Sequence, residues 1–267
     1  MIFHNFRAKH ILICLSFIGI VACAPQTGSL EVRANGEDFV RQGFVSKDGW
    51  AISFDNVIIS LANVTAYQTD PPYQSITGET PEGESISLAQ VHQIDLAEGD
   101  ENAAPILVEA IEANVGQFNA IGWNMVSSDN GSTVQMIGTA VKDNTTISFN
   151  ILIEDTYSYI CGEYVGDERK GFVSEGEAGE IEMTFHFDHL FGDADTDASE
   201  PLNTGALGFD PLANLAFNDT LEITQAELEA SLSADEYASL LDNLATLGHV
   251  GEGHCFEAQN GYTAHEE

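Results

Sequence analysis

Apolar and polar residues alternate along much of the chain between residues 50 and 187. An alternation with a period of two gives a β-strand one apolar face. The clearest apolar runs are Trp50, Ile52 and Phe54; Ile121, Trp123 and Met125; Ile147, Phe149, Ile151 and Ile153; and Ile181, Met183, Phe185 and Phe187. Segments rich in Gly, Asn and Asp separate the runs and favour turns. The pattern predicts a mainly β fold, either an antiparallel β-sandwich or a barrel-like domain.

The alternation changes parity once, at Asp55 and Asn56. Apolar residues occupy even positions up to Phe54 and odd positions from Val57 onward. A shift of one residue exchanges the two faces of a strand, so a β-bulge or a tight turn is expected at this point.

The pattern becomes helical after about residue 218. Thr224 and Ser233 each precede a glutamate by three residues, the spacing of a capping box. Behind the second box, apolar residues recur at helical spacing: Tyr237, Leu240, Leu241, Leu244 and Leu247. Gly248 then stands where a glycine commonly follows the end of a helix. We expect a small C-terminal helical hairpin.

The N-terminus carries the parts of an export signal. Arg7 and Lys9 are positively charged, and residues 11–21 are apolar but too few for a membrane-spanning helix, which needs roughly 20. The sequence ending at Cys23, Ile-Val-Ala-Cys, resembles the lipobox of bacterial lipoproteins. The resemblance implies cleavage after Ala22 and a diacylglyceryl group on Cys23. A plain secretory signal with an incidental cysteine is the alternative.

The lipoprotein resemblance also implies a place in the cell. It implies a bacterial envelope protein whose partner is the lipid membrane, reached through the Cys23 anchor. Position 24 is Ala rather than Asp, which favours the outer membrane facing the periplasm in enteric-type bacteria, with surface exposure as a second possibility. The chain then divides into a signal peptide (1–22), a tether (23–30), a β-sandwich (31–217) and a C-terminal helical appendage (218–267).

Two cysteines, Cys161 and Cys255, remain after removal of the signal and acylation of Cys23. In an oxidising compartment such a pair is most simply a disulfide, which would tie the C-terminal appendage back to a strand. Thiolate ligation of a metal is the weaker reading, because neither cysteine belongs to a Cys-x-x-Cys pair.

The chain is strongly acidic. Of its 8 Lys and Arg residues, 2 lie in the signal, so 6 remain against 43 Asp and Glu and the formal charge becomes −37. Such a surface repels phosphates and argues against nucleic acid as a partner. It would concentrate cations, although a strongly acidic surface is also typical of proteins in a salty medium.

One segment carries candidate metal ligands. His186, Asp188 and His189 lie at the end of the strand that begins near Ile181, and His249 and His254 follow the predicted helix. Imidazole and carboxylate groups are ligands that zinc, copper and iron accept. The alternative is that the histidines simply bond to nearby carboxylates on the surface.

Alternating aspartates follow the histidine segment. Asp193, Asp195 and Asp197 resemble the opening half of a calcium-binding loop. Ala198 replaces the glycine of the sharp turn, and Thr204 stands where the twelfth-position glutamate would be. A solvated acidic loop is therefore the competing interpretation of these residues.

No arrangement of residues indicates catalysis. The chain has no Gly-x-Ser-x-Gly turn, no phosphate-binding glycine loop and no assignable pair of nucleophile and base, so an enzyme is the less favoured class. The sequence favours a non-catalytic, membrane-anchored envelope lipoprotein that binds a divalent metal ion. The alternative is a metal-free lipoprotein that docks another envelope protein.

Overall fold

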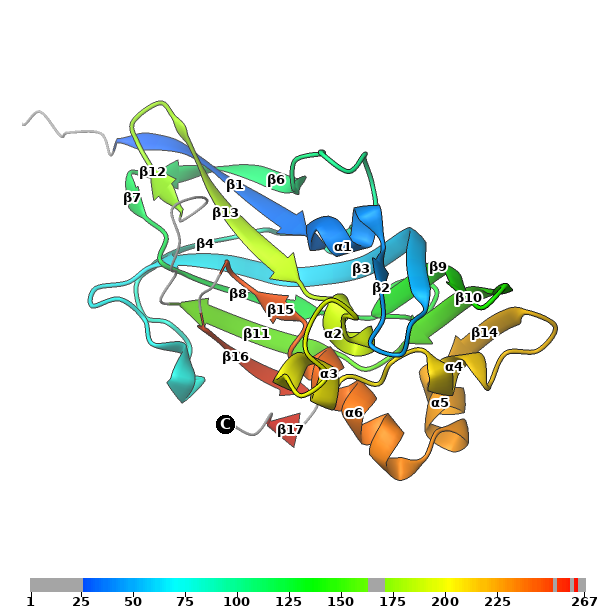
Figure 1. The fold of residues 1–267 in the computed structure, drawn as a ribbon. Coiled ribbons are helices and arrows are strands. Elements are labelled where there is room, and N and C mark those ends of the chain that lie inside the picture. Colours follow the sequence, from blue (N-terminus) through cyan, green and yellow to red (C-terminus); the bar gives the residue numbers. More distant parts are fainter. Residues whose placement is uncertain (1–25, 163–170, 252–253, 260–261, 264–267) are drawn as a thin grey trace, which may run out of the picture.

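Two open β-sheets make up most of the fold, with short helices gathered beside them (Figure 1). The computed structural model describes residues 26–162, 171–251, 254–259 and 262–263. The mainly β prediction is confirmed, and neither sheet closes into a barrel. Within the described residues, no helix has the length and apolar character needed to cross a membrane.

The smaller sheet, sheet A, has four strands in the order β15-β13-β1-β6. Their bounds are β1 Thr27–Asn35, β6 Ile106–Asn114, β13 Ala178–Phe185 and β15 Gly248–His249. Strand β1 pairs antiparallel with β6 and parallel with β13, so the two central strands run in the same direction. Because of this parallel pair, the carboxyl ends of β1 and β13 meet at one edge of the sheet.

The larger sheet, sheet B, is built around the long strand β3, Ala51–Gln68. The main strand order is β14-β10-β9-β3-β8-β11-β16-β17. The bounds are β14 Thr220–Thr224, β10 Thr145–Ile153, β9 Val134–Lys142, β8 Ala120–Met125, β11 Tyr157–Gly162, β16 His254–Gln259 and β17 Tyr262–Thr263. Three short strands also pair with β3: β2 Phe44–Val45, β4 Glu84–Ser87 and β5 His92–Asp95. A separate ribbon joins β7 Gly116–Gln117 to β12 Phe172–Val173.

The predicted irregularity in β3 is present. The register between β3 and β9 shifts between Phe54 and Asn56, so the apolar residues on both sides of the shift can face the core. The direction of pairing was less predictable, because β1 with β13 and β10 with β14 are parallel rather than antiparallel.

The two sheets pack against each other through large aromatic side chains. The Trp123 ring of β8 stacks on Tyr159 of β11 at 5.1 Å between ring centroids, and it meets Phe185 of β13 edge-on at 6.0 Å. All three side chains are fully buried. Such aromatic contacts fix the position of sheet A, and therefore of the chain that leaves β13 after Phe185.

In the part of the chain that the structure describes, seven helical segments complete the fold. They are α1 Glu37–Gln42, η1 Ser75–Thr77, α2 Asp188–Phe191, α3 Pro201–Gly205, α4 Asp210–Ala213, α5 Gln225–Ser231 and α6 Ala234–Ala245. Both predicted capping boxes are present, at Thr224 before α5 and at Ser233 before α6. The few helices near the C-terminus are thus as expected.

Gly248 does not end helix α6, contrary to the sequence prediction. The helix ends at Ala245 with Thr246 as its C-cap, and Gly248 belongs to β15. A Cβ atom at position 248 would lie 2.8 Å from the Trp123 ring and 3.0 Å from the Tyr159 ring. The glycine is therefore explained by the close approach of β15 to these rings.

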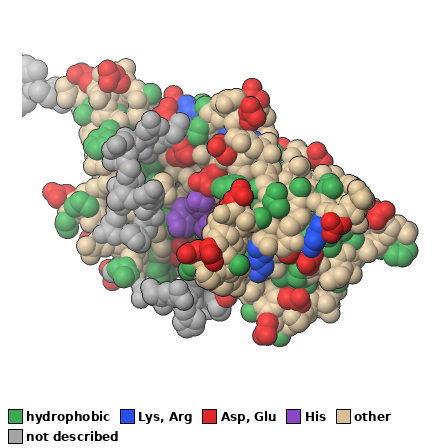
Figure 2. Space-filling model, viewed as in Figure 1, with side chains coloured by type: hydrophobic (Ala, Val, Ile, Leu, Met, Phe, Trp, Pro, Cys, Tyr) green, Lys and Arg blue, Asp and Glu red, His purple; other side chains and the backbone are tan. Residues whose placement is uncertain are grey.

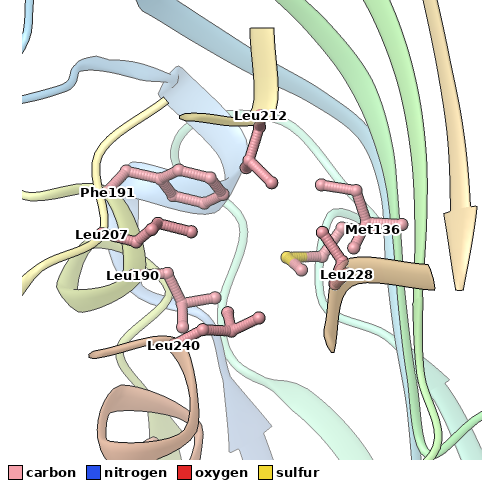
Figure 3. A pocket seen from close by; sticks show the side chains of 8 residues that line it. Met136, Leu190, Phe191, Leu207, Leu212, Leu228 and Leu240 are labelled. Carbon is pink, nitrogen blue, oxygen red and sulfur yellow. The ribbon is translucent and has the colours of Figure 1, made fainter. Parts of the chain in front are cut away.

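A small apolar cavity lies between sheet B and the helices (Figure 3). Its volume is about 10 Å³, and its lining is entirely apolar, including Met136, Leu190, Leu228 and Leu240. This is close to the volume that one water molecule needs, but the lining offers a water no hydrogen-bonding group. The cavity is a packing gap and not a candidate ligand site.

Two of the predicted boundaries are wrong. The tether was expected to reach residue 30, but β1 begins at Thr27 because its backbone is paired with β6 and β13 on both sides. Residues 218–267 are not a separate helical appendage, because β14 and β16 join sheet B and β15 joins sheet A. The C-terminal part therefore completes the two sheets.

The predicted disulfide between Cys161 and Cys255 is present. The two cysteines are directly opposite each other on β11 and β16. The bond fixes β16, which follows helix α6 and β15, to β11 near the β17 end of sheet B.

Glu257 provides a test of stability against pH. It lies partly buried on β16 opposite Tyr159, and its burial raises the pKa of the carboxyl group to about 7. In the unfolded chain the same group titrates near 4.5. A raised carboxyl pKa contributes stability that is present below about pH 4.5 and is lost as the pH rises through about 7.

We therefore expect Glu257→Gln to stabilise the protein at pH 8 by about 1–2 kcal/mol, allowing for partial screening by solvent. The stability of the variant should also fall less between pH 5 and pH 8, as measured by urea unfolding at each pH. Glu222→Gln, at an exposed position of β14, is the matched control. If the stability of Glu257→Gln depended on pH in the same way as that of the parent, the raised pKa of Glu257 would be contradicted.

Candidate metal centre

The histidine segment lies where the chain leaves sheet A. Strand β13 ends at Phe185, and the backbone N–H of His186 donates to the carbonyl of Leu247 at 3.0 Å. Helix α2 then begins at Asp188 and is held by its buried residues Leu190 and Phe191. The apolar residues of this short helix fill the core, so its polar residues are left at the edge of the sheet.

Strand β15 brings the third histidine to the same place. Thr184 of β13 is opposite His249 in the antiparallel pair with β15. The His249 ring meets the His186 ring edge-on at 5.0 Å between centroids. The rings of His186 and His189 are stacked, 4.8 Å apart and inclined by 11°. Figure 2 shows histidine side chains reaching the surface on this face.

Three groups lie close enough to share one ion. One ligand atom from each of His186, Asp188 and His189 lies within 4.8 Å of the other two. Among the described residues this is the one group of three or more such side chains that could hold a metal ion. Two imidazole nitrogens and a carboxylate oxygen would supply three of the four ligands of a tetrahedral zinc site. His249 is not in the group, although its ring meets that of His186.

The carboxylate of Asp188 is the unusual member of the group. The residue is only 5% exposed, and Oδ1 has no hydrogen-bond partner in the described part of the chain. Burial raises the pKa of the carboxyl group, although the charges of His189 and His186 act in the opposite direction. A buried carboxylate without a full set of partners is costly, and a bound cation would offset that cost.

Glu37 lies behind His186. Its Oε2 is 3.0 Å from Nδ1 of His186, and it occupies the first position of α1 with a φ of 59°. Asn35, the last residue of β1, accepts a hydrogen bond from the backbone N–H of Glu37 at 3.0 Å. Because β1 and β13 are parallel neighbours, the residues that follow them meet at the same sheet edge.

Glu37 and His186 affect each other's protonation. The hydrogen bond from His186 lowers the pKa of Glu37. Burial acts to lower the pKa of His186, but the hydrogen bond and charge of Glu37 outweigh it and the pKa is raised. With Nδ1 donating to Glu37, Nε2 of His186 is the available ligand atom. A carboxylate that orients a metal-binding histidine in this way is common in metal sites.

His189 has the opposite electrostatic environment. Burial lowers the pKa of its imidazole, against the attraction of Asp188. A neutral imidazole can bind a metal without first releasing a proton. The centre therefore combines one histidine whose neutral form is favoured by burial with another held in place by a carboxylate.

The other predicted site residues are distributed differently. His254 lies on β16 opposite Gly162, but its side chain is outside the described residues. Cys23 is outside them as well. His249 is next to the centre, as described above. Glu37 was not suggested by the sequence, because Glu37 lies far from the histidines along the chain and no spacing pattern connects it to them.

Carboxylates of the predicted calcium loop accept hydrogen bonds from backbone N–H groups of the same loop. Asp193 accepts from the backbone N–H of Asp195 at 2.9 Å, and Asp197 accepts from the backbone N–H of Ser199 at 2.9 Å. Asp193, Asp195 and Asp197 do not gather into a group that could hold an ion. These carboxylates form turns instead, which agrees with the interpretation as a solvated acidic loop.

Comparison of the chain with protein-family models, with curated proteins and with solved structures gives no match.

Proposed function

We propose that this protein is a lipid-anchored lipoprotein of the bacterial envelope that binds a divalent transition metal and is not an enzyme. The observation that carries the metal proposal is the buried carboxylate of Asp188, which lies within 4.8 Å of a ligand atom of each of His186 and His189 and has an oxygen without a hydrogen-bond partner among the described residues. The lipobox-like sequence ending at Cys23 supports the anchor.

The ligand types favour zinc, copper or iron over calcium. His186 and His189 contribute nitrogen atoms, whereas calcium takes six to eight oxygen ligands. Zinc fits four positions filled by His186, His189, Asp188 and either His249 or water. The acidic surface would raise the local concentration of any divalent cation, which suits capture or buffering of the ion near the membrane.

Metal content of the purified protein tests the proposal. A soluble form, residues 24–267, is produced in an oxidising compartment without a histidine tag and measured by mass spectrometry of the elements after dialysis. We expect about one equivalent of zinc, copper or iron per chain. Alanine at both His186 and His189 should remove the metal, because the variant loses two of the three grouped ligands.

His92→Ala is the matched control. His92 lies on β5, where its Nε2 is 3.2 Å from Glu109, so it pairs with a carboxylate away from the grouped ligands. Its loss should leave the metal content unchanged. Absence of any transition metal in the parent protein, even after reconstitution, would overturn the proposal and direct attention to a protein partner.

A further inference from the structure

The described chain begins at one end of the molecule, which we call the N-terminal tip and define as residues 26–28, 115–117 and 172–177. The start of β1, strand β7 and strand β12 lie together there (Figure 1). The backbone N–H of Val115 donates to the carbonyl of Gln26 at 3.0 Å, and that of Gly176 donates to the carbonyl of Thr27 at 2.9 Å. The side chain of Gln26 donates to Glu175 at 2.9 Å. The tip is thus built directly around the first described residues.

Two large apolar side chains are exposed on this tip. Phe172 is 59% exposed and Val115 is 38% exposed. In the β7–β12 ribbon, Phe172 is opposite Gln117 and Val173 is opposite Gly116. Successive strand residues point to opposite sides, so Phe172 lies on the outer face of the ribbon while Val173 is buried on the inner face. Val115 is exposed in the bend directly before β7.

Little chain separates the tip from the proposed anchor. Thr27, the first residue of β1, is four positions after Cys23. A fully extended chain of four residues spans at most about 14 Å. A diacylglyceryl group on Cys23 would therefore hold the tip at the bilayer surface, and the domain could not move far from it.

We propose that the N-terminal tip docks on the bilayer, with Phe172 and Val115 inserted into its interfacial layer. This inference rests on the lipid anchor of the proposed function and is independent of the metal centre. The partner is a lipid surface of neutral headgroups, because Glu175 and Glu177 are both exposed in the turn of the tip and would be repelled by anionic lipid. Anchor and tip together fix the orientation of the domain on the membrane.

A tryptophan at position 172 tests the docking. The full chain carrying Phe172→Trp is produced with its signal, purified in detergent and reconstituted into phosphatidylcholine vesicles with and without brominated acyl chains. After subtraction of the parent's emission, we expect the new tryptophan to shift to shorter wavelength on reconstitution and to be quenched by the brominated chains. Trp50 and Trp123 of the parent are buried and provide a constant background.

Phe217→Trp is the matched control. Phe217 is 78% exposed and precedes β14, which lies at the opposite end of the molecule from β12 (Figure 1). Its emission should show neither the shift nor the quenching. Equal quenching at positions 172 and 217, or no quenching at position 172, would overturn the docking.

Flotation with vesicles separates the two possible failures. If the parent protein floats and Cys23→Ser does not, the anchor stands, and an unquenched tryptophan at position 172 then refutes the docking alone. If the parent does not float, the anchor of the proposed function fails, and the docking fails with it.

Discussion

Asp188→Asn is expected to weaken zinc binding while making the metal-free protein more stable. The substitution keeps the shape of the side chain but removes a charged ligand, so the affinity should fall by at least the roughly 10–100-fold that the loss of an outer-shell partner costs. It also removes a buried charge that lacks a full set of partners. We expect the free energy of unfolding without metal to rise by about 1–2 kcal/mol.

Two measurements check this pair of effects. Calorimetric titration with zinc gives the affinity, and urea unfolding in the presence of a chelator gives the stability of the metal-free protein. Asp195→Asn is the control, because Asp195 is exposed in the loop after α2 and should change neither quantity. A variant at position 188 that binds zinc like the parent would show that the carboxylate is not a ligand.

Removal of the Cys161–Cys255 disulfide is expected to have the largest effect on stability. The bond joins residues 94 positions apart. In the chain-entropy model, closing a loop of this length in the unfolded chain stabilises the folded state by about 4–5 kcal/mol. Replacing both cysteines by alanine should lower the free energy of unfolding by this amount, measured by guanidinium unfolding followed through tryptophan emission.

Reduction provides the internal check on the disulfide. The parent treated with a reductant should lose about the same stability as the double variant, and the double variant should not respond to the reductant at all. A loss below about 1 kcal/mol would mean that the unfolded chain is already constrained in other ways.

Local features of the fold were predictable because they depend on neighbouring residues. The alternation around Ile121, Ile147 and Ile181 located β8, β10 and β13, and the change of parity at Asp55 located the irregularity in β3. The capping boxes located the starts of α5 and α6. In each case the signal and the structure it predicts lie within a few residues of each other.

The pairing of distant strands was not predictable in the same way. An alternating strand shows which of its faces is apolar but not which strand lies beside it or in which direction that strand runs. The parallel pairs β1 with β13 and β10 with β14 were therefore missed, and with them the role of the C-terminal residues in both sheets.

The candidate site was only partly predictable for the same reason. His186, Asp188 and His189 are adjacent in the sequence, so their proximity could be expected. Glu37 reaches His186 only through the parallel pairing of β1 with β13. The aspartates after α2 have the right spacing for a calcium loop, but spacing does not reveal that their oxygen atoms are used by backbone N–H groups of their own turns.

The parallel pairing of β1 with β13 also bears on when the protein can fold. Ser29 pairs with Ala178, a partner 149 positions further along the chain, so sheet A cannot form until most of the polypeptide is available. Pairings between such distant segments slow folding, because the intervening chain must close before any contact is gained. The first strand of the chain can therefore pair in sheet A only after the residues of β6 and β13 have been added to the chain.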